Sequence, residues 1–345
     1  HIPRPHQLTA EITQVYVNPD VADPATASAE LQAELTAVRR QITANQPLVE
    51  AILQEQVAAI LVEQDMAPQG LLASIWPDAW PPVMVQMTPL PSLLMVSPRD
   101  RIERSHSLTL VNGLPVAARE EMETAVYEQM NLSALVVPIG GLSTYPSMIF
   151  ESSNLNWLME VIAHEWAHHW LTLRPLGLNY ADPQVRIINE TVAGIVDREI
   201  GALAIARYYP ELAPPETEPE EVPAPAGPAK PPAFDFRAEM AETRIEVDRL
   251  LAAGQVEAAE TYMEAQRQMF VENGYQIRKL NQAYFAFYGA YADRPGASGS
   301  NPVGLLVQEA RALSPSLRAF LETMAPITSL AELEETVAGL RNAGD

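Results

Sequence analysis

The residues best suited to chemistry in this chain lie close together, between positions 164 and 168. His164 and His168 are four residues apart, and Glu165 directly follows the first histidine, which gives the pattern H-E-x-x-H. On an α-helix, side chains four residues apart share one face with about 5–6 Å between their Cβ atoms, so both imidazoles can bind one zinc ion. Glu165 lies beside that pair and can reach a metal-bound water, so we expect it to act as a general base.

Histidine is scarce elsewhere in the chain. Of the six histidines in 345 residues, three lie within 164–169. An H-E-x-x-H match can also be an ordinary helical surface, but this clustering favours a metal site. His169 lies about 100° around the helix from His168, so we expect it to be a packing or surface residue.

The residues around the motif predict the helix that it needs. A cap is available at Ser152, Ser153 or Asn154, and Pro175 and Gly177 end the helix. Apolar residues recur at spacings of three or four, at Leu155, Leu158, Met159, Ile162 and Trp166. The histidines are therefore expected inside a helix and not on a loop.

A catalytic zinc site needs a third protein ligand and an open position for water. Glu190, 22 residues after His168, is the best candidate. Asp182 followed by Pro183 has the form of an N-cap with proline at the first helical position. Glu190 is therefore expected in a second helix, which runs to about Tyr209.

Glu190 shares one face of that second helix with Gly194, Asp197 and Gly201. Glycine lowers helix stability by roughly 1 kcal/mol relative to alanine, so two glycines on this face indicate a close approach to the first helix. Asp197 is then expected to accept a hydrogen bond from the second ring nitrogen of a ligand histidine.

The two segments together resemble a known group of enzymes. H-E-x-x-H followed by N-E-x-x-A, here residues 189–193, is similar to the gluzincin metallopeptidases, which include thermolysin-like and aminopeptidase-like enzymes. The longer pattern N-E-x-x-A-x-x-x-[DE] also resembles a family of bacterial predicted aminopeptidases, with Asp197 at the acidic position. The close match covers about 151–200. The resemblance implies a zincin-like core, with Glu165 as the base and with zinc bound by His164, His168 and Glu190.

The composition excludes several classes of partner. Lys and Arg number 22 against 44 Asp and Glu, which gives a formal net charge of −22. Nucleic acid and anionic membrane surfaces both require a basic surface, so neither is expected as a partner. No apolar run reaches 18 residues, so we expect no membrane span. The chain has no cysteine, which excludes disulfides and thiolate ligands.

The amino terminus bears on location. The chain begins with His1-Ile2-Pro3 in place of methionine, as a processed product would. Removal of a signal peptide or of an N-terminal membrane anchor is one cause of such a start. We therefore expect an extracytoplasmic, secreted or membrane-anchored protein, with a cytoplasmic protein as the alternative.

Composition and periodicity divide the chain into four parts. These are an N-terminal extended arm and long helix over 1–70, a catalytic core over 71–209, a Pro/Glu-rich linker over 210–233, and a helical region that walls the cleft over 234–345. The prolines of residues 1–24 predict an extended conformation there. Pro47 is expected to divide the helical segment that spans about 25–64.

Short β-rich runs predict a small mixed sheet between about 80 and 150. The runs are 83–87, 93–96, 108–111 and 135–137, with a helix at about 116–130. Residues 147–150, directly before the histidine helix, are expected to form a further strand. That strand is either a sheet edge that pairs with an extended peptide substrate or an ordinary core strand.

A tyrosine is the candidate donor to the oxyanion that forms during peptide hydrolysis. Tyr284, within the aromatic stretch 280–288, is preferred. Tyr288, Tyr180 and Tyr145 are the alternatives.

These observations predict a mainly α, α+β zinc metallopeptidase that acts on a peptide or protein substrate. Its expected cofactor is Zn²⁺, and its expected fold is a zincin-like core with a small mixed sheet and additional C-terminal helices. Two alternatives remain open. One is a non-catalytic binding or scaffold protein that keeps zinc for structure or has lost turnover, which a fourth protein ligand on the metal would favour. The other is a self-blocked proenzyme of the same fold.

Overall fold

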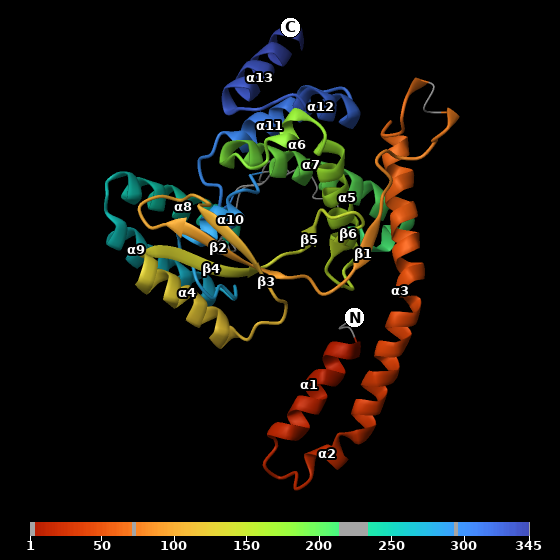
Figure 1. The fold of residues 1–345 in the computed structure, drawn as a ribbon, viewed down its shortest axis with the longest axis vertical. Coiled ribbons are helices and arrows are strands. Elements are labelled where there is room, and N and C mark those ends of the chain that lie inside the picture. The colour runs from red at the N-terminus through yellow and green to blue at the C-terminus, as the bar shows by residue number, and fades with distance from the viewer. Residues whose placement is uncertain (1–3, 71–73, 214–233, 293–295, 345) are drawn as a thin grey trace, which may run out of the picture.

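The computed structural model describes residues 4–70, 74–213, 234–292 and 296–344. Within these residues the chain is mainly helical, and its strands form two separate three-stranded sheets (Figure 1). The prediction of a mainly α, α+β protein with little sheet is confirmed. Most of the predicted linker, residues 214–233, lies outside the described residues.

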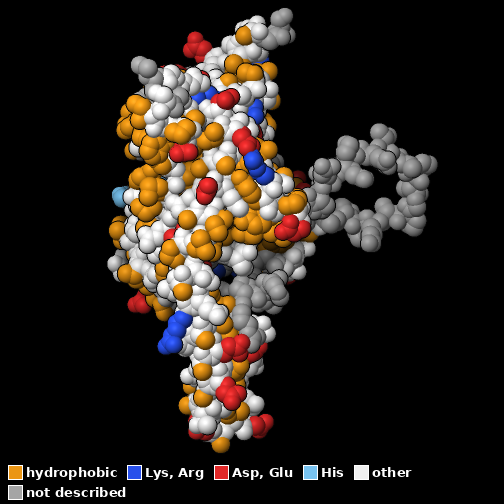
Figure 2. All heavy atoms as spheres, turned by 90° about the vertical axis from the view of Figure 1, so that its right-hand side faces the viewer, with side chains coloured by type: hydrophobic (Ala, Val, Ile, Leu, Met, Phe, Trp, Pro, Cys, Tyr) orange, Lys and Arg blue, Asp and Glu red, His pale blue; other side chains and the backbone are white. Residues whose placement is uncertain are grey.

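The first helices form a hairpin whose closed end projects from the rest of the molecule, whereas the second half of its long helix packs in the main core (Figures 1 and 2). They are α1 (Arg4–Val17), α2 (Pro24–Ala27) and α3 (Ala29–Glu63). The prediction of an extended conformation over 1–24 is therefore wrong for residues 4–17, and residues 1–3 lie outside the described residues. Pro5 lies in the first turn of α1, where a backbone N–H has no helical partner, so it does not break the helix. Packing of α1 on α3, with Leu8 fully buried, stabilises the helix.

Helix α3 is continuous through Pro47, so the predicted division at this residue is also wrong. A proline inside a helix removes one backbone hydrogen bond. Side chains on either side of Pro47 bond instead to strand β1 (Val85–Met87), which holds this part of α3 in place. Gln46 Nε2 donates to the Met87 carbonyl and the Met87 N–H donates to Glu50, each at 2.6 Å.

The first sheet has the strand order β1-β6-β5, in which β6 (Ser147–Ile149) is parallel to β1 and antiparallel to β5 (Gly141–Leu142). The strand before the histidine helix, β6, is thus the central strand of its sheet. Of the two alternatives for residues 147–150, the structure favours the core strand, because both of its edges are paired. The outer strand of this sheet is β5.

The second sheet is antiparallel, with the order β3-β2-β4. Its strands are β2 (Ser92–Pro98), β3 (His106–Leu110) and β4 (Leu132–Pro138). Helix α4 (Val116–Met130) connects β3 to β4, as predicted. Helix α10 (Gln282–Tyr288) packs on this sheet, with Ala283 buried against Met95 and Leu135.

Two long helices form the centre of the larger core. These are α5 (Leu155–Leu171) and α7 (Pro183–Tyr208), joined through the short α6 (Pro175–Leu178) and followed by the 3-10 helix η2 (Pro210–Leu212). Asn154 caps α5 by accepting a hydrogen bond from the Trp157 N–H at 3.2 Å. Asp182 caps α7 by accepting a hydrogen bond from the Gln184 N–H at 2.8 Å. The predicted caps of both helices are confirmed, and α7 ends at Tyr208, close to the predicted Tyr209. Helix α5 ends at Leu171, four residues before Pro175, which begins α6.

The helices beyond residue 234 contribute to different cores. Helices α11 (Val303–Leu313), α12 (Leu317–Met324) and α13 (Leu330–Gly344) pack with α5 and α7. Helices α8 (Phe236–Ala252) and α9 (Val256–Glu272) form a smaller core of their own, which α10 joins to the second sheet. None of the helices in the described ranges combines the length and apolar character needed to cross a membrane.

Helix α7 approaches α5 closely at Gly201. A Cβ atom at this position would lie 2.8 Å from Cγ and 3.2 Å from the backbone nitrogen of Glu160. We expect Gly201→Val to lower the free energy of unfolding by about 1–3 kcal/mol, because the two helices would have to separate. Chemical denaturation measures this change. Gly339→Val in α13 is the matched control, since a Cβ there meets no described atom within 4 Å; equal losses in both variants would contradict the packing argument.

Candidate metal centre

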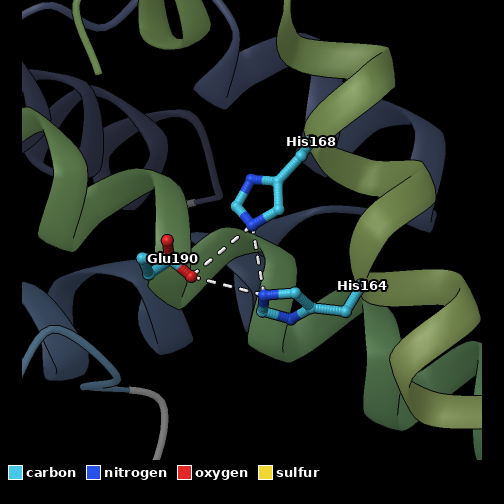
Figure 3. A group of neighbouring side chains, drawn as sticks. All are labelled: His164, His168 and Glu190. Carbon is cyan, nitrogen blue, oxygen red and sulfur yellow. Dashed lines mark hydrogen bonds and ion pairs between the residues drawn. The ribbon is translucent and has the colours of Figure 1, made fainter. Parts of the chain in front are cut away.

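Three donor atoms from α5 and α7 converge on one point (Figure 3). The Nε2 atoms of His164 and His168 are 3.1 Å apart. Glu190 Oε2 lies 3.3 Å from His164 Nε2 and 3.5 Å from His168 Nε2. The three residues that the sequence indicates as ligands are thus brought together, although Glu190 comes from a different helix.

The spacing of these atoms suits a tetrahedral metal ion. Zinc binds imidazole nitrogen and carboxylate oxygen at about 2.0–2.2 Å, so two ligands of one tetrahedral ion lie about 3.3–3.6 Å apart. The three observed separations, 3.1, 3.3 and 3.5 Å, are close to that value. Among the described residues no further His, Asp or Glu joins the group. The donor set therefore fits zinc and leaves a tetrahedral ion one position for a non-protein ligand.

Hydrogen bonds to the remaining ring nitrogens orient both imidazoles. His164 Nδ1 lies 2.9 Å from Asp197 Oδ2, and His168 Nδ1 lies 2.8 Å from Asn189 Oδ1. Both partners are oxygen acceptors, so each Nδ1 donates its proton and each Nε2 can direct a lone pair to the shared point. Asp197 has the role that its spacing predicts. The sequence predicted no role for Asn189, because only the packing of α7 on α5 places it beside His168.

The charges of the group depend on one another. Burial lowers the pKa of His164, but Asp197 and Glu190 outweigh this effect and hold that pKa well above its ordinary value. Burial raises the pKa of Glu190, but His168 and His164 outweigh it and hold that pKa well below its usual range. A positive charge is thus favoured at the point where the three side chains meet, and a bound cation would supply it.

Tyr180 orients Glu190, the third member of the donor group. Its hydroxyl donates a short hydrogen bond to Glu190 Oε1, the oxygen that faces away from the two histidines. Burial and then the negative charge of Glu190 raise the pKa of Tyr180, so the hydroxyl remains a donor. Tyr180 was an alternative for the oxyanion donor, but its hydrogen bond gives it a role in positioning Glu190.

The carboxylate of Glu165 is held from the side of β5. It lines the same cavity as the two histidines, and its Oε2 accepts a short hydrogen bond from the Ser143 hydroxyl. A Cβ atom on Gly141 would lie 2.0 Å from Glu165 Oε1, so only glycine leaves room for the carboxylate. In the sequence, Gly141 and Ser143 look like ordinary loop residues, and no spacing rule connects them to Glu165.

The group opens into a cavity of about 510 Å³. Helices α5 and α7 form one wall. The opposite wall comes from the second sheet and α10, through Leu93, Met95, Ser107 and Phe287. Residues far apart in the chain therefore enclose the site.

Tyr291, three residues after α10, also lines this cavity. Its ring centroid is 6.2 Å from that of His164, and the charge of Glu190, followed by burial, raises its pKa. Tyr284, the tyrosine preferred from sequence, is not among the described residues that line the cavity; its ring packs against Phe285 and Tyr288. The aromatic stretch is thus mainly core, and Tyr291 lies just beyond it.

His169 does not join the donor group. Its Nε2 lies 2.8 Å from the Thr144 carbonyl, and its ring packs on Tyr145 with 5.2 Å between centroids. Burial lowers its pKa, so the neutral ring is favoured. This arrangement agrees with the packing role expected from its position on the helix.

Asp197→Asn tests the support of the first ligand. The amide keeps the shape of the side chain but loses the negative charge beside His164 Nδ1. We expect the dissociation constant for zinc to rise about tenfold to a hundredfold, the usual cost of losing such a partner. Competition with a chromophoric chelator measures it. Asp100→Asn, on an exposed carboxylate, is the control; an unchanged affinity in Asp197→Asn would mean that this carboxylate does not support the ligand.

Comparisons with protein-family models, with curated proteins and with solved structures found no match to this chain.

Proposed function

We propose that this protein is a zinc-dependent peptide hydrolase with a zincin-type core. The observation that carries the proposal is the convergence of His164, His168 and Glu190, with separations of 3.1–3.5 Å, in a cavity that Glu165 also lines. The resemblance of the two sequence segments to gluzincin metallopeptidases agrees with this donor set. Three protein ligands are typical of catalytic zinc, whereas structural zinc sites are closed by four.

The three ligands would hold the zinc through His164 Nε2, His168 Nε2 and Glu190 Oε2. When bound, zinc polarises the scissile carbonyl and makes water a stronger acid at neutral pH. Asp197, Asn189 and Tyr180 orient the ligand atoms toward the metal, as described above. These hydrogen bonds within the protein direct the three ligand atoms toward one point.

Glu165 would act as the general base and then as the general acid. It accepts a proton from the attacking water and passes it to the amine that leaves. Ser143 holds one carboxylate oxygen by its short hydrogen bond, and Gly141 limits the room around the other. The carboxylate is thus positioned by the Ser143 side chain and the space left by Gly141, and not by the residues that would bind the metal.

Tyr291 is the best candidate for the donor that stabilises the oxyanion. Its phenol lies near both Glu190 and Glu165, whose charges contribute to raising its pKa and so keep the hydroxyl protonated. We expect Tyr291→Phe to lower kcat about a hundredfold while zinc content is unchanged. Steady-state kinetics with metal analysis checks this result. Tyr284→Phe, outside the cavity, is the control, and equal kcat values for the two variants would remove Tyr291 from the mechanism.

The function itself is tested with the full chain and a mixed peptide library. Bound metal is measured by elemental mass spectrometry of the acid-digested protein. Peptide cleavage is followed before chelation, after chelation and after zinc is restored. The proposal predicts about one zinc per chain and cleavage that chelation removes and zinc restores. Stoichiometric zinc without cleavage of any peptide would instead favour the non-catalytic alternative.

A further inference from the structure

Two arginines line the metal cavity although basic residues are scarce in this chain. The chain has 22 Lys and Arg against 44 Asp and Glu. Apart from the histidines and the two glutamates already described, the charged residues among the described lining are Arg104 and Arg186. Their placement is therefore not explained by a generally basic surface.

Arg186 is buried without a polar partner. Only 8% of its surface is exposed, and among the described residues its side chain makes no hydrogen bond or ion pair. Its nitrogens are not sealed from solvent, since the one fully buried, unsatisfied side-chain atom in the described chain is Gln282 Oε1. Arg186 lies one helical turn before Glu190 on α7, about 6 Å along the axis. Its free guanidinium therefore opens into the cavity close to the metal ligands.

Arg104 enters the cavity from the opposite side, just before β3. Its Nε lies 3.2 Å and its Nη2 2.5 Å from Ser107 Oγ, which leaves Nη1 without a partner among the described residues. Burial lowers the pKa of Arg186 and the positive charge of Arg104 lowers it further, whereas the nearby carboxylates of Glu190 and Asp182 act in the opposite sense. The two guanidinium groups are therefore close enough to repel each other. An anion bound between two like charges in a cavity would relieve their repulsion.

We propose that Arg104 and Arg186 bind a carboxylate of the peptide substrate. The planar guanidinium group matches a carboxylate through two parallel hydrogen bonds, and its positive charge persists at any physiological pH. With a divalent cation bound, the cavity is net positive, because the two arginines offset the charges of Glu165 and Glu190. The carboxylate is either the free C-terminus of the peptide or an Asp or Glu side chain near the scissile bond.

This inference rests on the proposed function for the identity of the ligand, so it is tested by binding and not by turnover. The protein used is the full-length Glu165→Gln variant, loaded with zinc. Isothermal titration calorimetry compares Ac-Ala-Ala-Ala-OH with Ac-Ala-Ala-Ala-NH₂, and Ac-Ala-Glu-Ala-NH₂ with Ac-Ala-Gln-Ala-NH₂. We expect one carboxylate peptide to bind about tenfold to a hundredfold more tightly than its amide. The pair that shows the difference identifies the source of the carboxylate.

The arginines are then replaced in the same background. Arg186→Gln and, separately, Arg104→Gln should each reduce the preference for carboxylate over amide at least several-fold. Arg186→Lys should restore only part of it, because an ammonium group cannot form the paired hydrogen bonds. Arg341→Gln is the matched control, since Arg341 is exposed and paired with Glu309 on α11. Zinc content and melting temperature establish whether each variant is folded. If Arg186→Gln does not fold, Arg104→Gln provides the test.

Two outcomes overturn the inference: equal affinities for carboxylate and amide in both pairs, and a preference that persists in both arginine variants. The second would mean that the carboxylate binds the metal alone. Failure of the proposed function gives a different pattern. If the protein with Glu165 intact cleaves no peptide but carboxylate binding still depends on Arg186 and Arg104, the arginine site stands and the hydrolase proposal falls.

Discussion

Replacing Glu165 with glutamine is expected to lower the rate of peptide hydrolysis by about 10²–10⁴-fold, while zinc remains bound. Glutamine has nearly the same shape as glutamate, so it can keep the contacts with Ser143 and Gly141 that hold the side chain. Its amide cannot accept the proton of the attacking water. The loss should therefore appear in kcat, and metal content should stay at the wild-type value.

The measurement is steady-state hydrolysis of a peptide selected from the library, together with metal analysis of the same sample. Glu151→Gln is the matched control, since Glu151 is an exposed acid shortly before α5. It should hydrolyse the peptide at the wild-type rate. Wild-type activity in Glu165→Gln would reject the mechanism, and loss of zinc from this variant would show that Glu165 contributes to metal binding instead.

Replacing His168 with alanine is expected to weaken zinc binding more than hundredfold. Loss of a residue that only hydrogen-bonds to a ligand, such as Asp197, costs at most about a hundredfold. The change removes one of three donor atoms and leaves Asn189 without the imidazole that it orients. A ligand that binds only the folded state stabilises it by about 4 kcal/mol at a thousand times its dissociation constant. Chelation should therefore lower the melting temperature of the wild type markedly and that of His168→Ala only slightly.

His169→Ala is the control for this prediction. His169 is the next residue on α5, but its ring binds the Thr144 carbonyl and not the donor group. It should retain zinc and the stabilisation that zinc provides. Retention of zinc by His168→Ala, with loss of zinc from His169→Ala, would show that the metal site uses a different histidine.

The parts of the fold predicted correctly from sequence depend on short-range interactions. The Asn154 and Asp182 caps of α5 and α7 act within three residues, and the four-residue spacing of His164 and His168 is set by the geometry of one helix. Gly201 marked the close contact of α7 with α5, because glycine in a helix calls for a packing reason. The caps and the histidine spacing can each be read within a single helix. The glycine can be read because helices otherwise disfavour this residue type.

The wrong predictions involve interactions between distant segments. The prolines near the N-terminus and Pro47 suggested breaks, yet α1 is stabilised by packing on α3, and bonds from Gln46 and Glu50 to Met87 support α3. Tyr284 was preferred for its aromatic context, but that context is the packing of α10 on a sheet. Composition shows that a proline disfavours a helix, but it cannot show which distant segment stabilises the helix in spite of it.

By itself, the amino-acid sequence determined the helices that carry the histidines and Glu190, and the predominance of helix over strand, because caps and periodicity act over one or two turns. Only the tertiary structure decided which oxygen atoms orient the two imidazoles, how Ser143 and Gly141 hold Glu165, and that Tyr291, Arg104 and Arg186 share its cavity. These relationships join α5 and α7 to β5, to the second sheet and to the segment after α10. Their geometry depends on how elements of separate cores are placed around one cavity, and no spacing along the chain encodes it.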